Sequence, residues 1–336
     1  MMNGLFDKHD FFADKASVPS RLAWGDPQKC PDPHVTVIMP VYRRPDFFAK
    51  ALASALQQDY TGAYEVVVVD NNQEPDSPNQ TVVEQAADPR VLYYRNSENL
   101  GMYQNWNRGI ELARAPYVTF CHDDDLLLPG ALRILLQLAP AVGQACVLSA
   151  YHTIDENDRI TGTTLQHKPH LGFIQPRKLV RYTRLGQYLG NVSCGDGCLY
   201  HRQSLLEAGG YDSDFYPAAD YALHVAYAHF YGAWINTEPT ACYRVADNES
   251  IKVYEAFPDA MKKVHRCMAA RRGKPSRLLT RFIEAMYANN RDMSRRAWGG
   301  ADKTGRTMTA GQRFLVGMAR RLNAVNYYAF GRRSSV

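Results

Sequence analysis

The sequence lacks the features of a disulfide-stabilised, zinc-binding or membrane-spanning protein. Its seven cysteines are odd in number, and no two of them have the CxxC spacing of a zinc or redox site. No apolar run reaches the roughly 20 residues that a membrane-spanning helix needs. Residues 1–8 lack the basic head and apolar stretch of a secretory signal. We therefore expect free, mostly buried thiols and a location in the reducing cytoplasm.

Several motifs of phosphate binding and hydrolysis are absent as well. The chain contains neither GxGxxG nor GxxxxGK[ST], so a nicotinamide dehydrogenase or a P-loop NTPase would lack its phosphate-binding loop. It also lacks the GxSxG of a hydrolase and the HExxH of a zinc protease. A phosphate-bearing ligand would therefore need another source of positive charge, such as a bound metal ion.

The net charge of +5 conceals a division of the chain into an acidic and a basic part. Residues 261–336 contain 18 Lys and Arg against 3 Asp and Glu, whereas residues 1–260 contain 21 against 31. The basic segment is either a solvated face that balances the acidic part or a surface for anionic lipid, phosphate-bearing acceptors or nucleic acid. Nucleic acid is disfavoured because no recognised binding motif accompanies the charge.

Short apolar strands alternate with helical segments between residues 34 and 121. The sequence predicts strands over Val35–Met39, Glu65–Val69, Val91–Tyr94 and Tyr117–Cys121, and helices over Phe47–Leu56, Thr81–Ala87 and Tyr103–Ala113. The run of valines before Asp70 is typical of a strand buried on both faces. This alternation predicts an α/β fold, with a Rossmann-like, mostly parallel sheet and ligands bound at the carboxyl ends of its strands.

Polar side chains follow each predicted strand, and the fourth strand is followed by three carboxylates, Asp123, Asp124 and Asp125. Mutual repulsion would raise the pKa of these carboxyl groups unless a cation lay among them. Oxygen ligands suit Mg²⁺ or Mn²⁺, which keep positions open for water and substrate phosphates. Alternatively, the carboxylates favour the dipole of a following helix.

These segments carry a resemblance to a known family. They are Pro40-Val41-Tyr42, Val69-Asp70-Asn71-Asn72, Asn99-Leu100-Gly101, Asn107-Arg108-Gly109, Phe120 to Asp125, Gly209-Gly210-Tyr211-Asp212, Tyr216 to Leu223 and Tyr243-Arg244-Val245. In order and spacing they resemble the motifs of GT-A-fold, family 2 glycosyltransferases over residues 34–250. The chain departs from the family pattern at four places. Asn71 and Ala219 stand where an acid is common. The family often has an arginine two residues before the match to Asn107, whereas here Trp106 lies just before it, and Ala246 and Asp247 occupy the region where some relatives have a histidine.

The resemblance implies roles for particular residues. Asp220 would be the catalytic base, and Asp125 with Asp123 would hold Mg²⁺ or Mn²⁺. The nucleotide-sugar would be bound by Pro40, Tyr42, Asp70, Asn99, Asn107, Asp123 and Asp124. Tyr42 could equally be a turn aromatic, and Asp220 also suits the start of a helix over Tyr221–Tyr231. Two further interpretations stay open: His122 lines the site or packs beside it, and Asp196 binds sugar hydroxyls or forms a turn.

The expected function is metal-dependent, inverting transfer of a sugar from a nucleotide-sugar, preferably a UDP-sugar, to a hydroxyl of a saccharide or lipid-linked acceptor. Such a reaction would serve surface polysaccharide or glycoconjugate synthesis. A sugar-nucleotide nucleotidyltransferase is disfavoured because Arg43-Arg44-Pro45 is basic without the glycines of its loop. A non-catalytic carbohydrate-binding scaffold of the same fold is the other alternative, although Asp125 and Asp220 are both present.

We expect an N-terminal extension over residues 1–33, a glycosyltransferase domain over 34–250 and a basic helical segment over 251–336. In that last segment Phe314, Leu315, Met318, Leu322, Val325 and Ala329 form an apolar stripe at helical spacing. The stripe suits either docking on the chain's own domain or on a second subunit, or contact of residues 300–333 with the inner face of a membrane. Docking is the more common use of such a stripe.

Overall fold

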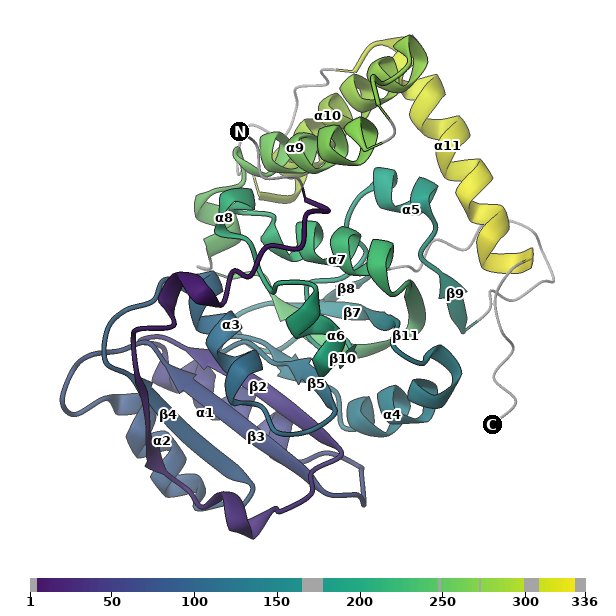
Figure 1. Ribbon diagram of the computed structural model, residues 1–336. Helices are drawn as coiled ribbons and strands as arrows, with labels where there is room; N and C mark the ends of the chain where they lie inside the picture. The colour runs from purple at the N-terminus through teal and green to yellow at the C-terminus, as the bar shows by residue number, and fades with distance from the viewer. Residues whose placement is uncertain (1–4, 165–177, 247–248, 272, 299–307, 330–336) are drawn as a thin grey trace.

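The computed structural model describes residues 5–164, 178–246, 249–271, 273–298 and 308–329, which form two sheets surrounded by helices (Figure 1). The first sheet has the strand order β1-β4-β3-β2-β5-β10. Its strands are β1 (Ser20–Trp24), β2 (Val35–Val41), β3 (Tyr64–Asp70), β4 (Val91–Asn96), β5 (Tyr117–Phe120) and β10 (Tyr200–His201). The four inner strands pair in parallel, and the outer strands β1 and β10 pair antiparallel. The predicted mostly parallel sheet is confirmed.

Helices cover both faces of this sheet because its central strands are apolar on both faces. The helices up to residue 230 are α1 (Pro45–Leu56), α2 (Pro78–Ala86), α3 (Met102–Leu112), α4 (Ala131–Val142), α5 (Arg184–Leu189), α6 (Arg202–Glu207) and α7 (Ala219–Phe230), with short 3₁₀ helices at Ala13–Lys15, Pro27–Lys29 and Ser213–Phe215. Val37 of β2 belongs to the same core as Leu52 of α1, whereas Ile38 belongs to the core of Ile110 in α3. Each predicted strand and helix up to Ala113, and the strand after it, is present with its ends shifted by at most three residues.

The first predicted strand continues through Pro40 instead of stopping there. The Ile38 carbonyl accepts the Cys121 N–H from the β5 side, whereas the Val41 carbonyl accepts the Asn71 N–H from the β3 side. Alternation along the strand therefore turns the Pro40 nitrogen toward β5. Because pairing with β5 ends at Ile38, the missing N–H of proline costs no ladder hydrogen bond there.

A second sheet, which the sequence pattern did not reveal, completes the body of the molecule. Its order is β6-β11-β7-β8, with β9 also beside β11. The strands are β6 (Leu126–Leu127), β7 (Cys146–Ile154), β8 (Ile160–Thr163), β9 (Leu179–Arg181) and β11 (Ala233–Arg244). The register of β11 against β7 shifts between Asn236 and Ala241, around Pro239, which breaks the apolar alternation of a strand. Pairing of β11 with β6 brings Arg244 close to the three consecutive aspartates.

The segment predicted as an N-terminal extension contributes a strand to the first sheet. Ser20 in β1 lies opposite Asn96 in β4. The guanidinium of Arg108 in α3 donates to the Val18 carbonyl at 2.7 Å and to the Lys15 carbonyl at 2.9 Å. These contacts fix residues 15–24 against the sheet, and the predicted domain boundary at residue 33 stays a prediction.

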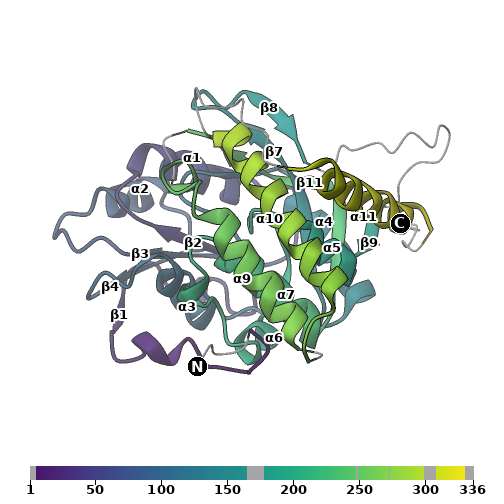
Figure 2. The ribbon, with the colours of Figure 1, turned by 90° about the horizontal axis from the view of Figure 1, so that it is seen from above.

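The described residues from Glu249 onward form the helices α8 (Glu249–Lys252), α9 (Phe257–Ala270), α10 (Arg277–Trp298) and α11 (Ala310–Ala329). Seen from above, α9 and α10 cross the molecule side by side and α11 runs along its edge (Figure 2). Among the residues that the structure describes, every helix is too short or too polar to span a lipid bilayer.

Helix α11 docks through a different face from the apolar stripe that the sequence suggested. Val316 and Ala319 are buried, whereas Phe314, Met318, Leu322 and Val325 are exposed. The Ala329 side chain and residues 300–307 and 330–333 lie outside the part that is described. One face of α11 therefore packs on the protein, while most of the apolar stripe lies on the exposed face.

Candidate active site

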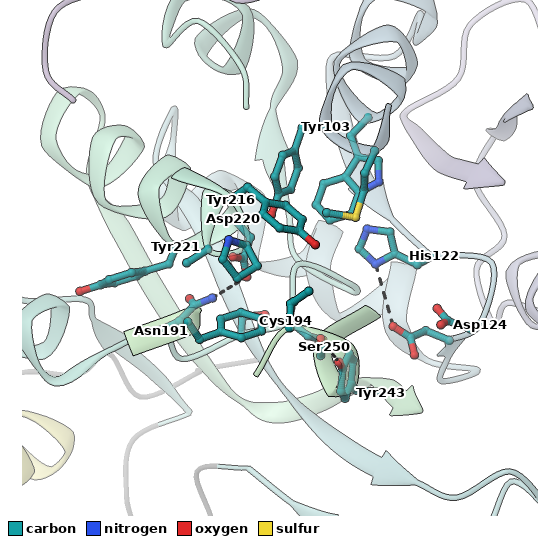
Figure 3. A pocket seen from close by; sticks show the side chains of 18 of the residues that line it. Tyr103, His122, Asp124, Asn191, Cys194, Tyr216, Asp220, Tyr221, Tyr243 and Ser250 are labelled. Atoms are coloured by element: carbon teal, nitrogen blue, oxygen red, sulfur yellow. Dashed lines mark hydrogen bonds and ion pairs between the residues drawn. The ribbon is translucent and has the colours of Figure 1, made fainter. Parts of the chain in front are cut away.

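A cavity of about 710 Å³ lies at the carboxyl ends of β2 and β5 and is also lined by residues of the C-terminal helices. Of the residues predicted for the site, those that line it are Pro40, Tyr42, Asn99, Asp123, Asp124, Asp125 and Asp220. His122 lines it as well. The cavity therefore gathers the three consecutive aspartates and Asp220 from segments about 100 residues apart (Figure 3).

Two predicted residues, Asp70 and Asn107, are not among those that line the cavity. The Asp70 carboxylate is fully buried and accepts hydrogen bonds from the Asn72 N–H, Ser77 Oγ, Asn79 Nδ2 and Tyr93 Oη. The Asn107 side-chain amide donates to the Tyr211 carbonyl at 3.0 Å and accepts the Tyr211 N–H at 2.8 Å. In this structure both side chains therefore shape the loops beside the cavity instead of pointing into it.

The three consecutive aspartates have different surroundings. Asp123 Oδ2 accepts the backbone N–H of Tyr42 at 2.9 Å, and Asp124 forms an ion pair with Arg44. Asp125 Oδ1 accepts the backbone N–H of Arg244 at 2.7 Å, and Asp125 is 1% exposed. The Asp124 side chain is more accessible than that of Asp125, with 15% of the side chain exposed against 2%.

Burial and mutual repulsion make this cluster costly to ionise. Burial, with the Asp124 charge as a second cause, raises the pKa of Asp123 to about 7. Burial and the charges of Asp196 and Asp124 raise the pKa of Asp125 well above its usual range. A divalent cation would remove the repulsion, and carboxylate oxygens are the ligands that Mg²⁺ and Mn²⁺ prefer. The donor set lining the cavity thus fits such an ion.

His122 is held beside the cluster by a buried carboxylate. Its Nδ1 lies 2.8 Å from Asp196 Oδ2, and its backbone N–H donates to Asp196 Oδ1 at 2.7 Å. Although burial opposes protonation, the Asp196 carboxylate raises the pKa of His122. The His122 Nε2 atom is buried without a hydrogen-bond partner among the described residues. Its hydrogen-bonding capacity is therefore not used by the protein groups described around it.

The interpretation of Asp196 as a sugar-binding residue does not fit this arrangement. Asp196 is fully buried, and both of its carboxylate oxygens face His122. Residues His122, Asp125 and Asp196 bring one ligand atom each within 4.8 Å of one another, so they also meet the spacing of a metal site. The Gly195-Asp196-Gly197 loop, which suggested a turn, serves to insert this carboxylate behind His122.

Asp220 lies in the first turn of α7, on the opposite side of the cavity from the consecutive aspartates (Figure 3). Its Oδ2 accepts a hydrogen bond from Asn191 Nδ2 at 2.7 Å. Burial raises the pKa of Asp220 to about 6. A carboxyl with this pKa is mostly ionised at neutral pH and can accept a proton in the cavity.

A chain of hydrogen bonds behind Asp220 fixes its orientation, and sequence analysis missed it. Asn191 Oδ1 lies 2.9 Å from His224 Nδ1, and His224 Nε2 lies 2.7 Å from Tyr200 Oη. Burial lowers the pKa of His224 to about 3, so the imidazole is neutral. Because the amide N–H of Asn191 must face the carboxylate, its oxygen faces a protonated Nδ1, and Nε2 accepts from the Tyr200 hydroxyl.

The sequence contained one signal for this series of hydrogen bonds behind Asp220. His224 follows Asp220 by four residues, which places both on the same face of a helix. Asn191 and Tyr200 come from other segments and carried no signal of their own.

The fold and the site together define the class of protein. A mostly parallel sheet presents acidic side chains at its strand ends, and a separate carboxylate lines the same cavity, whose size suits a nucleotide. The family model for glycosyl transferase family 2 matches residues 36–209, and the chain belongs to this family. The resemblance, the fold class and the enzyme class that the sequence indicated are confirmed.

Curated relatives match over parts of their length. A GalNAc(5)-diNAcBac-PP-undecaprenol beta-1,3-glucosyltransferase of Campylobacter jejuni is 36% identical over 108 residues, which is 32% of this chain and 35% of the relative. The putative colanic acid biosynthesis glycosyl transferase WcaA of Escherichia coli is 32% identical over 105 residues, which is 31% of this chain and 37% of the relative. An uncharacterized protein of Mycobacterium tuberculosis, MT1568, is 28% identical over 56% of this chain and 60% of its own length. The chain thus spans between about one third and three fifths of these relatives.

Solved structures share the fold at low sequence identity. The S. aureus TarS fragment 1-349 aligns with a TM-score of 0.55 and 16% identity over 88% of this chain and 89% of the fragment. The mannosyltransferase PcManGT from Pyrobaculum calidifontis, in complex with GDP-Man and Mn²⁺, aligns with a TM-score of 0.53 and 16% identity over 93% of this chain and 86% of its own. The overall α/β architecture is therefore shared with glycosyltransferases of distant sequence.

Proposed function

We propose that this glycosyltransferase moves a sugar from a nucleotide-sugar to an acceptor hydroxyl with inversion at the anomeric carbon, with the help of a divalent metal. The observation that carries the proposal is the cavity itself, which has Asp124 on one side and Asp220 on the other (Figure 3) and is also lined by Asp123. Separation of a metal-binding side from a base allows a leaving group and an acceptor to lie on opposite faces of one sugar. Direct displacement across that sugar inverts its configuration.

The donor would occupy the side of the cavity nearest β2 and β5. Tyr42, which is 40% exposed and lines the cavity, would cover the base. Asn99 reaches the same wall and is held by Asn71 Nδ2 at 2.7 Å. The structure of TarS in complex with UDP-GlcNAc and that of PcManGT with GDP-Man support a nucleotide-sugar donor. We keep the sequence-based preference for a UDP-sugar.

Asp124, assisted by Asp123, is the carboxylate that we propose to hold Mg²⁺ or Mn²⁺. When bound, the ion would neutralise the charge that develops on the departing diphosphate. Asp125, the ligand favoured from the sequence, already accepts the Arg244 N–H with one oxygen and lies beside the buried Asp196, so we assign it the role of orienting the strand end. His122, which lines the cavity and is held by Asp196, would contact the same diphosphate or the sugar through its Nε2 atom.

Asp220 is the proposed general base. It would take the proton of the attacking acceptor hydroxyl, whose acidity rises as its bond to the anomeric carbon forms. The Asn191 amide holds one oxygen of this carboxylate, and the acceptor hydroxyl would approach the carboxylate from the cavity. Two relatives, the undecaprenol-linked glucosyltransferase and the putative colanic acid biosynthesis transferase, support a saccharide or lipid-linked acceptor and a role in surface polysaccharide or glycoconjugate synthesis.

Nucleotide binding tests the donor part of this proposal. Because a ligand that binds the folded state alone raises the apparent stability, UDP together with Mn²⁺ is expected to raise the melting temperature more than either does alone. At a nucleotide concentration of about 100 Kd the gain is about 2.7 kcal/mol. GDP measured in parallel tests the preference for uracil. A melting temperature that no nucleoside diphosphate moves, with or without Mn²⁺, would instead favour the non-catalytic scaffold.

The pH profile of an Asn191 variant tests the orientation of Asp220. Asn191→Leu removes a hydrogen bond that stabilises the charged carboxylate, so the pKa of Asp220 rises. Since the base must be ionised, the acid limb of the kcat/KM profile moves to higher pH. Gln203→Leu, which removes an exposed amide paired with Glu207, is the matched control and leaves the profile in place. An Asn191→Leu profile that differs only in height would contradict the assignment.

A further inference from the structure

Helix α11 has an inner face that holds it on the protein. Val316 is buried against Ala285 and Met286 of α10, and Ala319 is buried as well. Further along the helix, Asn323 Oδ1 lies 3.2 Å from Thr183 Oγ1 at the start of α5. The helix is thus fixed to the body of the molecule without its largest apolar side chains.

Those side chains form a stripe on the outer face. Phe314, Met318, Leu322 and Val325, the outer stripe, are 70%, 45%, 60% and 51% exposed. Their spacing of four, four and three residues places them on one side of the helix at about 100° per residue. Single exposed apolar residues need no explanation, but four aligned on one helix mark an interaction surface.

The charges around the outer stripe indicate what it contacts. The sequence of α11 contains no Asp or Glu, and Arg313 and Arg321 are exposed on it. A basic amphipathic helix with large apolar residues suits the interface of an anionic bilayer. A second copy of the chain is less suited to this surface, because four side chains of one convex helix offer far less than the about 800 Å² per partner of a stable interface.

The same helix also belongs to the cavity wall. Arg320 lines the cavity together with Asn290, Met293 and Ser294 of α10. Figures 1 and 2 both place α11 at the edge of the molecule, next to α10 and away from the first sheet. If the outer stripe contacted a bilayer, the cavity wall that α11 contributes would lie one helix diameter, about 10 Å, from the lipid.

We propose that the outer stripe and its flanking arginines dock this enzyme on an anionic lipid bilayer and so present the cavity to an acceptor at the membrane surface. The statement about the acceptor rests on the proposed function, whereas the docking itself does not. The binding is peripheral, because it uses one face of a helix whose other face is packed on protein.

Vesicle flotation of the full chain tests this docking. The wild-type chain is expected to float with vesicles of phosphatidylcholine and phosphatidylglycerol and to float less with phosphatidylcholine alone. A triple variant, Phe314→Ser with Met318→Ser and Leu322→Ser, is expected to lose more than about tenfold in partitioning. Arg313→Gln with Arg321→Gln is expected to lose about fivefold per arginine on the anionic vesicles alone.

Ile160→Ser is the matched control, since Ile160 is 60% exposed on β8, and it is expected to float as the wild type does. A triple variant that floats like the wild type would overturn the proposal. So would a wild-type chain that ignores vesicles but sediments as a dimer that the triple variant splits. The response of the melting temperature to nucleotide and Mn²⁺ in the triple variant is expected to match the wild type, which separates failure of docking from failure of the donor site.

Discussion

Asp220→Asn is expected to lower kcat by about 10²- to 10⁴-fold while leaving the affinity for donor nucleotide within about twofold. The carboxylate lies on the far side of the cavity from the consecutive aspartates, so its loss removes proton acceptance and spares the donor site. Fold disruption is not expected, because an asparagine oxygen at this position can still accept the hydrogen bond of Asn191. Steady-state kinetics with the acceptor and calorimetric titration of UDP with Mn²⁺ measure the two quantities.

The wild-type pH profile supplies an independent check on Asp220. Burial raises the pKa of this carboxyl to about 6, and the base must be ionised to work. The kcat/KM of the wild-type enzyme should therefore fall as the pH is lowered through about 6, and the residual activity of Asp220→Asn should not show that limb. An Asp220→Asn enzyme that keeps at least half of the wild-type kcat would rule out Asp220 as the base.

Asp124→Asn is expected to abolish the metal dependence of donor binding and to weaken binding with Mn²⁺ by more than about 100-fold. Removal of groups that merely support a metal ligand costs 10- to 100-fold, so loss of a ligand itself costs at least as much. Asp125→Asn should cost less than about tenfold, because its retained oxygen still accepts the Arg244 N–H. Titration of UDP with and without Mn²⁺ compares the two variants.

Asp59→Asn is the control for surface charge, since Asp59 pairs with Arg133 at the surface and does not line the cavity. It should bind nucleotide and Mn²⁺ as the wild type does. The opposite order, in which Asp125→Asn loses the metal effect and Asp124→Asn keeps it, would restore Asp125 as the main ligand.

The first sheet could be predicted because its signals are local. Valine runs, helical spacing and polar strand ends follow one another along the chain, and parallel strands place their carboxyl ends at one edge. The second sheet could not be predicted in the same way. Its longest strand, β11, contains Pro239 and a register shift, and its pairing with β7 joins segments about 90 residues apart.

The polar contacts of the site were harder to foresee than its acids. Asp70 follows its strand as expected, but Ser77, Asn79 and Tyr93 surround it and take up its carboxylate. Asp196 reaches His122 from a loop 74 residues away. Such partners are set by tertiary packing, which a pattern of residue types does not encode.

Helix α11 shows the same limit for apolar residues. The sequence contains the larger stripe of Phe314, Met318 and Leu322 and the smaller pair Val316 and Ala319, and both have helical spacing. Burial of the larger side chains would remove more apolar area from water, but the α10 surface packs against the smaller pair. Only the neighbouring helix determines which face is covered.

A crystal structure with Mn²⁺ and UDP tests most directly the claim that acidic side chains at the end of β5 bind a cation that in turn binds a diphosphate. The account predicts an anomalous manganese peak between the Asp124 carboxylate and both phosphates, with Arg44 displaced from its ion pair. Nucleotide bound with no manganese peak, and with Asp124 still paired to Arg44, would contradict it.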